Sequence, residues 1–144
     1  MAELNCKRIG LGGLAGGVVW VVWDLIVHMK IIGPRYMEAQ QAGHLLPAPR
    51  YGAFLPVWIL TILALALVGA KLYAMARTTC GAGPKTALKV GMMLGFAAGF
   101  PQNFSLATWG TFDRFFPLWW TLDLWVGAVL ATLVAAWLYR DKTV

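Results

Sequence analysis

Five polar side chains interrupt stretches of sequence that are otherwise apolar, and their chemistry suits the binding of protons or cations. Asp24 and His28 stand one helical turn apart in the first apolar stretch, and the other three are Gln102, Asn103 and Asp123. A charge inside a membrane is costly, so a carboxylate retained there needs a partner. The two amides are suited to orient a bound ligand. These five residues are therefore the candidate site for ligand or proton binding.

Each of these residues also has a purely structural interpretation. Asp24 and Asp123 could accept hydrogen bonds from tryptophan indoles, from Asn103 or from a loop arginine, or they could ligate a metal. His28 could be a hydrogen-bonding residue at the membrane interface. The only other histidine, His44, lies in a loop that does not constrain a metal geometry. The sequence therefore predicts no metal site and no cofactor.

The composition is that of a membrane protein. Of 144 residues, 60% are hydrophobic and 12% are charged, whereas soluble domains are about half apolar and a quarter charged. A helix of about 20 apolar residues crosses a bilayer, and four stretches are long enough to do so: 9–29, 54–73, 87–109 and 116–139. The second of these has no charge and is expected to be scaffold. We predict one all-α domain over residues 1–144, an integral membrane four-helix bundle.

The positions of the polar residues along the spans predict that they share one layer of the bundle. Successive spans run in opposite directions, and a helix rises 1.5 Å per residue. Asp24 then lies about 7 Å, Asn103 about 9 Å and Asp123 about 10 Å from the outer end of its span. Two tryptophans near this layer, Trp20 and Trp120, are candidate cavity walls, since indole faces attract cations, or else interface anchors.

Glycines at helical spacing predict close contacts between the spans. Gly-x-x-x-Gly patterns let two helices approach closely in a membrane. The glycines expected to pack helices are Gly13, Gly17, Gly91, Gly95, Gly99 and Gly127. Asp24 shares a helix face with Gly13 and Gly17, so its carboxylate should point toward another helix and away from lipid.

A weak internal repeat relates the two halves of the chain. The second span begins with Phe-Leu-Pro-Val-Trp at 54–58, and the fourth begins with Phe-Phe-Pro-Leu-Trp at 115–119. Because the two pairs of spans run in the same sense, the repeat predicts a parallel duplication of a two-helix unit.

The distribution of charge predicts the orientation. The net charge is +6, but the basic residues lie at span ends, which does not indicate a nucleic-acid partner. Eight lysines and arginines fall on the side of the N-terminus and four on the opposite side. Both termini are therefore expected in the cytoplasm. Cys6 and Cys80 would then face a reducing compartment as free thiols.

The segment 81–91, Gly-Ala-Gly-Pro-Lys-Thr-Ala-Leu-Lys-Val-Gly, together with Trp23, Asp24 and His28, resembles small uncharacterised bacterial four-span integral membrane proteins. The resemblance implies a bacterial inner (cytoplasmic) membrane and brings no activity with it.

Three functions fit these observations. Small-residue faces on at least three spans favour an accessory subunit of a larger membrane complex, or a homo-oligomer. The alternative is a proton- or cation-coupled binding or transport protein that uses the acidic residues, with Pro101 as a hinge. A membrane enzyme with an Asp/His acid–base pair is the third, but no complete catalytic constellation is present, so an enzyme is disfavoured. The expected partners are the lipid bilayer, other membrane subunits or a second copy, and a small ligand or cation.

Overall fold

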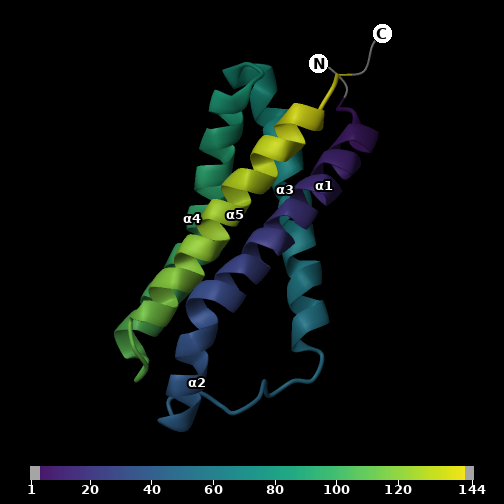
Figure 1. Ribbon diagram of the computed structural model, residues 1–144. Coiled ribbons are helices and arrows are strands. Elements are labelled where there is room, and N and C mark those ends of the chain that lie inside the picture. The colour runs from purple at the N-terminus through teal and green to yellow at the C-terminus, as the bar shows by residue number, and fades with distance from the viewer. Residues whose placement is uncertain (1–3, 142–144) are drawn as a thin grey trace.

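The computed structural model describes residues 4–141 and is built entirely from helices. In chain order these are α1 (Cys6–Val27), the π-helix η1 (His28–Ile32), α2 (Gly33–Gln41), α3 (Phe54–Cys80), α4 (Pro84–Trp109) and α5 (Phe115–Leu138). Figure 1 shows the long helices packed side by side, with the two ends of the chain at the same end of the molecule. No strand occurs in residues 4–141, so the predicted all-α class is confirmed.

The first helix does not end near Met29, as the sequence led us to expect. It continues through η1 into α2, and the three elements form one helical segment, Cys6–Gln41, of 36 residues. The N–H of Gly33 donates to the carbonyl of His28, five residues back, which is the wider π-helical bond. Pro34, which has no N–H to donate, is accommodated in the first turn of α2.

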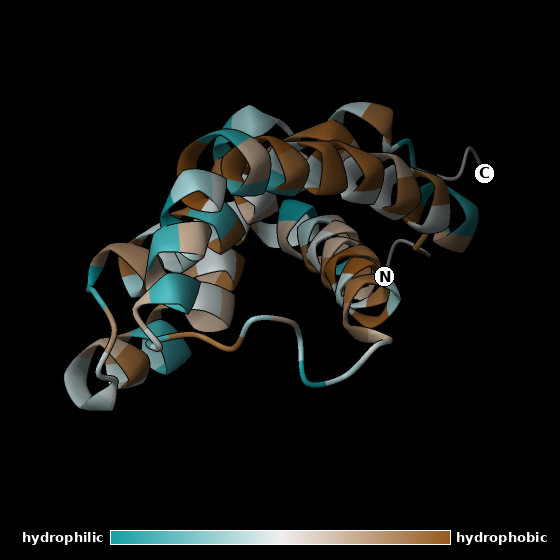
Figure 2. Cartoon of the chain, turned by 60° about the horizontal axis from the view of Figure 1, so that its bottom comes forward, coloured by the Kyte–Doolittle hydropathy of each residue, from teal (hydrophilic) through white to brown (hydrophobic). Residues whose placement is uncertain are grey.

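Three helical segments are long and apolar enough to cross a membrane: Cys6–Gln41, Phe54–Cys80 and Phe115–Leu138. Figure 2 shows hydrophobic residues running along the long helices, and many large apolar side chains are exposed, as lipid-facing side chains would be. α4 has sufficient length, 26 residues, but is not among the three. Its sequence includes Pro101, Gln102 and Asn103 in succession, which lowers its hydropathy.

α5 is the centre of the packing, and α4 and α1 lie against it most extensively. The glycine stripe of α4 faces α5, where Gly91 lies at Val129, Gly95 at Trp125 and Gly99 at Thr121. All three glycines are buried. A side chain at any of them would meet the backbone of α5, so this pair of helices is in close backbone contact.

α1 is packed between α3 and α5 through two glycine faces. Gly13 and Gly17 lie against leucines of α3, at Leu67 and Leu63. Gly12 and Gly16, which the sequence analysis did not single out, lie against the backbone of α5 at Ala135 and Ala131. The expected helix-packing glycines therefore all contact other helices of the same chain.

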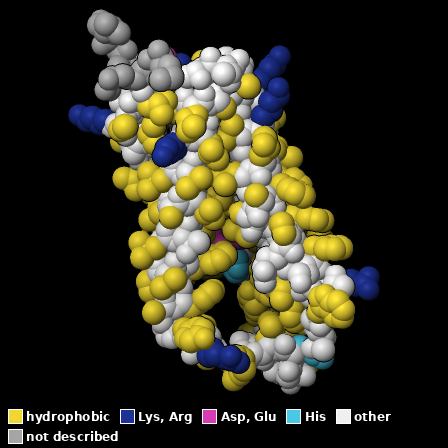
Figure 3. All heavy atoms as spheres, turned by 180° about the vertical axis from the view of Figure 1, so that it is seen from behind, with side chains coloured by type: hydrophobic (Ala, Val, Ile, Leu, Met, Phe, Trp, Pro, Cys, Tyr) yellow, Lys and Arg dark blue, Asp and Glu magenta, His cyan; other side chains and the backbone are white. Residues whose placement is uncertain are grey.

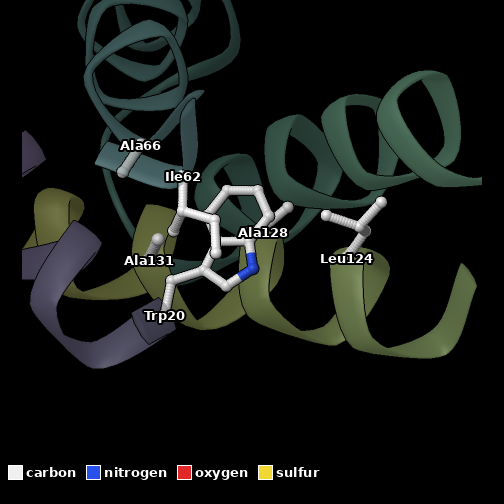
Figure 4. Close-up of a cluster of buried hydrophobic side chains, with 6 residues drawn as sticks. All are labelled: Trp20, Ile62, Ala66, Leu124, Ala128 and Ala131. Atoms are coloured by element: carbon white, nitrogen blue, oxygen red, sulfur yellow. The ribbon is translucent and has the colours of Figure 1, made fainter. Parts of the chain in front are cut away.

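The apolar core lies where α1, α3 and α5 meet. It contains Trp20, Ile62, Ala66, Leu124, Ala128 and Ala131, shown in Figure 4. Trp20 is fully buried, and its indole lies directly over Gly127, where any side chain would overlap it. Gly127 thus makes room for Trp20 in the core.

We expect Gly16→Ala to destabilise the protein and Gly10→Ala to have little effect. A methyl group at position 16 would overlap the backbone carbonyl of Ala131, whereas one at position 10 would meet nothing within 4 Å. Overpacking of this kind costs about 1–3 kcal/mol. Thermal unfolding of both variants in the same detergent measures the difference. Equal midpoints for the two variants would contradict the close packing of α1 on α5.

Candidate functional site

Two buried carboxylates and an imidazole meet at one point in the bundle. Asp24 comes from α1, His28 begins η1, and Asp123 comes from α5. His28 Nδ1 lies 3.5 Å from Asp24 Oδ1 and 3.7 Å from Asp123 Oδ2. Asp24 is 5% exposed and Asp123 is 1% exposed. We refer to these three residues as the acidic cluster.

The backbone of α1 holds the imidazole in place. His28 Nδ1 lies 2.9 Å from the carbonyl oxygen of Asp24, one turn earlier. A carbonyl oxygen can only accept a hydrogen bond, so Nδ1 carries the hydrogen in this arrangement. His28 is also the first residue of the π-helical turn, a departure from α geometry that occurs frequently at functional sites.

Tryptophans from two helices support the carboxylates. Trp58 Nε1 of α3 donates to Asp24 Oδ1 over 3.1 Å, and Trp23 Nε1 of α1 donates to the backbone carbonyl of Asp123 over 3.2 Å. One structural role considered above for Asp24 is to accept a hydrogen bond from a tryptophan indole, and the bond from Trp58 is of this kind. Asp24 is therefore tied to α3 as well as to His28.

Asp123 is less well satisfied than Asp24. Its Oδ1 is fully buried and has no hydrogen-bond partner among the described residues. Two other buried polar atoms share this condition, the indole nitrogens of Trp20 and Trp125, but neither residue lines the cavity described next. An unpaired buried polar group costs about 1–3 kcal/mol, and more when it is charged. The carboxylate of Asp123 is thus the polar group of this site that most requires a partner.

A cavity of about 330 Å³ adjoins the acidic cluster. Its lining residues come from η1, α2, α3, α4 and α5. They are His28, Tyr36, Phe54, Trp58, Ala98, Gln102, Asn103, Trp120, Asp123 and Leu124. Figure 3 shows the corresponding hollow between the helices, with acidic and histidine atoms visible at its edge and hydrophobic side chains around it. The site therefore combines an acidic end with walls made of four aromatic, two amide and two aliphatic side chains.

Hydrogen bonding and stacking hold the aromatic walls in position. Trp120 Nε1 donates to the hydroxyl of Tyr36 over 2.9 Å and so joins α5 to α2. Tyr36 stacks on Phe116 with ring centroids 5.4 Å apart. On the α3 side, Phe54 stacks on Trp58 with centroids 6.1 Å apart. The cavity is consequently bordered by rings whose orientations are set by their neighbours.

The structure brings most of the predicted site residues together. Asp24, His28 and Asp123 form the acidic cluster, and Gln102, Asn103 and Trp120 line the cavity beside it. Trp20, the other candidate cavity wall, lies in the core instead.

Five lining residues were not predicted from the sequence: the aliphatic Ala98 and Leu124 and three aromatic residues. Phe54 and Trp58 belong to the uncharged second span, which was expected to be scaffold, and Tyr36 lies beyond the expected end of the first span. Phe54 and Trp58 are one helical turn apart at the end of α3 nearest the polar layer, which was the available signal.

We expect Trp58→Phe to lower the thermal stability, because it removes the indole donor of Asp24 and leaves the ring in place. Loss of a bond to a charged acceptor should cost about 1–3 kcal/mol. Trp109→Phe, at a residue that is 85% exposed, is the matched control and should be close to neutral. Unfolding midpoints in detergent compare the two, and an equal loss in both would show that the Trp58 bond to Asp24 contributes nothing.

Comparisons of the chain with protein-family models, with curated proteins and with solved structures give no match. What this protein binds is therefore to be inferred from the chemistry of its own side chains.

Proposed function

We propose that this protein is a membrane-embedded four-helix bundle that binds a cation or a proton at the acidic cluster, in exchange with the adjoining cavity. The observation that carries the proposal is Asp123 Oδ1, a buried carboxylate oxygen with no partner within residues 4–141, in a residue that lines the cavity. A carboxylate accepts hydrogen bonds and attracts positive charge, so its missing partner is a donor or a cation. Anionic ligands would be repelled by two adjacent carboxylates.

The packing of α4 supports its assignment as a fourth span. Its glycines face α5, Asn103 is buried, and both Asn103 and Gln102 line the cavity, so these two amides have a protein environment beside them. Membrane helices tolerate polar residues and proline where neighbouring helices or cavities satisfy them. Its lysines, Lys85 and Lys89, lie in the first turns, where basic residues at a membrane surface belong.

The packing also favours a binding function over an accessory subunit or homo-oligomer. Small-residue faces on at least three spans favoured a partner protein or a second copy. In this chain those faces contact α1, α3, α4 and α5 themselves. The apolar side chains that stay exposed, such as Leu11, Leu60 and Met93, are of the type that lipid covers.

The proposed orientation places both termini in the cytoplasm of a bacterium, with the acidic cluster nearer the outer surface of the inner membrane. It is supported by the excess of basic residues on the side of the N-terminus. In this orientation the cavity is loaded from the outer side, and Pro101 beside Gln102 is positioned to let α4 bend during exchange.

We expect cations to stabilise the wild-type protein through Asp123. Thermal unfolding of the purified protein is measured with sodium, ammonium, zinc and 2-phenylethylammonium chlorides, and at least one should raise the midpoint. Asp123→Asn keeps the shape of the side chain but removes its charge, so the increase should be lost. Glu38→Gln, which removes an equal charge from a surface ion pair on α2, should retain it. Absence of any cation effect in the wild type would overturn the cation part of the proposal.

We expect the native cysteines to report the topology. Cys6 and Cys80 are both exposed, at the start of α1 and the end of α3. In intact cells a membrane-impermeant maleimide should label neither, and permeabilisation should expose both. In a cysteine-free background, Thr111→Cys in the loop after α4 should be labelled from outside. Labelling of positions 80 and 111 from the same side would show that α4 does not cross the membrane.

A further inference from the structure

The size of the cavity indicates a ligand much larger than a proton or a bare metal ion. The cavity measures about 330 Å³, at the lower end of the range of small-molecule sites in proteins. A water molecule occupies about 30 Å³ of liquid, and an ion held by three side chains needs no larger space. The cavity therefore has room for an organic molecule beside the carboxylate of Asp123.

The walls indicate the body of that molecule. Four of the lining residues are aromatic: Tyr36, Phe54, Trp58 and Trp120. Aromatic faces pack against apolar groups and also attract cations. The hollow is bordered by hydrophobic side chains in Figure 3, so a molecule with an apolar body can approach it from the membrane. Apart from the acidic cluster, the wall contains two amide side chains, those of Gln102 and Asn103.

The hydrogen bonds of the acidic cluster favour an N–H donor over a metal ion. The potential ligand atoms of Asp24, His28 and Asp123 lie within 4.8 Å of one another, and two carboxylates with an imidazole are residue types that can bind a metal ion. However, Nδ1 is the ring nitrogen that lies within 3.7 Å of both carboxylates. When it donates to the Asp24 carbonyl, the lone pair of the neutral ring is on Nε2 instead. Asp24 Oδ1 already accepts the hydrogen of Trp58. The free acceptor is Asp123 Oδ1, which suits a single donor.

Resting on the proposed function, we propose that the ligand is an organic ammonium ion with an apolar body. Its N–H group donates to the carboxylate of Asp123, which lines the cavity, and its body lies against the rings of Phe54, Trp58 and Trp120. The positive charge of the ammonium offsets the negative charge of the two carboxylates, and the aromatic faces stabilise the same charge. No covalent chemistry is involved, because the interaction is binding alone.

The test compares an ammonium probe with a neutral molecule of the same shape. The full chain is placed in nanodiscs of zwitterionic lipid, and binding of 2-phenylethylammonium and of 2-phenylethanol is followed by calorimetry against empty nanodiscs. The ammonium should bind about 10-fold more tightly or better, as expected for a hydrogen bond to a charged group. Asp123→Asn should remove this difference and leave 2-phenylethanol unchanged. Equal affinity of the two probes for the wild type would overturn the proposal.

A pair of phenylalanine variants tests the aromatic wall without altering the acidic cluster. Phe54→Leu removes an aromatic face that lines the cavity, at a half-exposed residue where folding should be preserved. It should weaken binding of 2-phenylethylammonium about threefold, as expected for an exposed cation–π contact. Phe104→Leu alters an exposed ring outside the cavity and should have no effect. Identical behaviour of the two variants would contradict the proposed pose.

Failure of this inference is distinguishable from failure of the proposed function. If zinc or sodium stabilises the wild type but not Asp123→Asn, while 2-phenylethylammonium does not bind, the organic ligand is wrong and the cation site stands. If no cation acts on the wild type and Asp123→Asn behaves identically, both proposals are wrong.

Discussion

The burial of Asp24 and Asp123 is the constraint around which α1, α3 and α5 are arranged. Two carboxylates in an apolar interior repel each other and lose their hydration, so each requires donors or positive charge close by. His28 lies within 3.7 Å of both, and Trp58 reaches across from α3 to Asp24. These contacts connect α1, α3 and α5 in the apolar interior, where polar groups without partners are costly.

Close packing elsewhere makes this meeting possible. α1 approaches the backbone of α5 at Gly12 and Gly16, and α4 approaches it at Gly91, Gly95 and Gly99. With these helices in backbone contact, Asp24 and Asp123 come within reach of the same imidazole. On the α3 side of the cavity, the rings of Phe54 and Trp58 form the wall, and no close contact through glycine occurs there among residues 4–141. The same chain therefore has a tightly packed region and a cavity next to it.

Helical geometry made a large part of this site predictable from the sequence. A constant rise per residue and alternating span direction place Asp24, Asn103 and Asp123 at one depth, whichever way the helices are rotated. The glycine spacing likewise indicates close contacts, because any side chain would separate the helices. It could not indicate whether those contacts lie within one chain or between copies, since both need the same small residues.

Other features depended on information that local patterns do not contain. The π-turn that carries helix α1 into α2, and with it Tyr36 toward the cavity, is a single shift in hydrogen bonding with no strong sequence signal. Pro34 gives no sign of this continuation, because proline at the first turn is typical of a helix start and is equally compatible with a helix that continues. The role of Trp58 could not be predicted from local sequence, because its partner, Asp24, lies on another helix. Whether an uncharged span contributes to a polar site depends on which helix it faces.

The two carboxylates differ in their hydrogen bonding and burial, which indicates that they have different roles. Asp24 accepts from Trp58 and lies one turn from His28, and this suffices to explain its presence as a structural group. Asp123 is more deeply buried, yet its Oδ1 has no partner among the described residues and the residue lines a cavity large enough for an organic molecule. Substitution by a similarly shaped apolar residue would relieve the cost of that orphaned oxygen. A ligand or proton would complete the carboxylate, which is why the proposed function assigns binding to Asp123 and an anchoring role to Asp24.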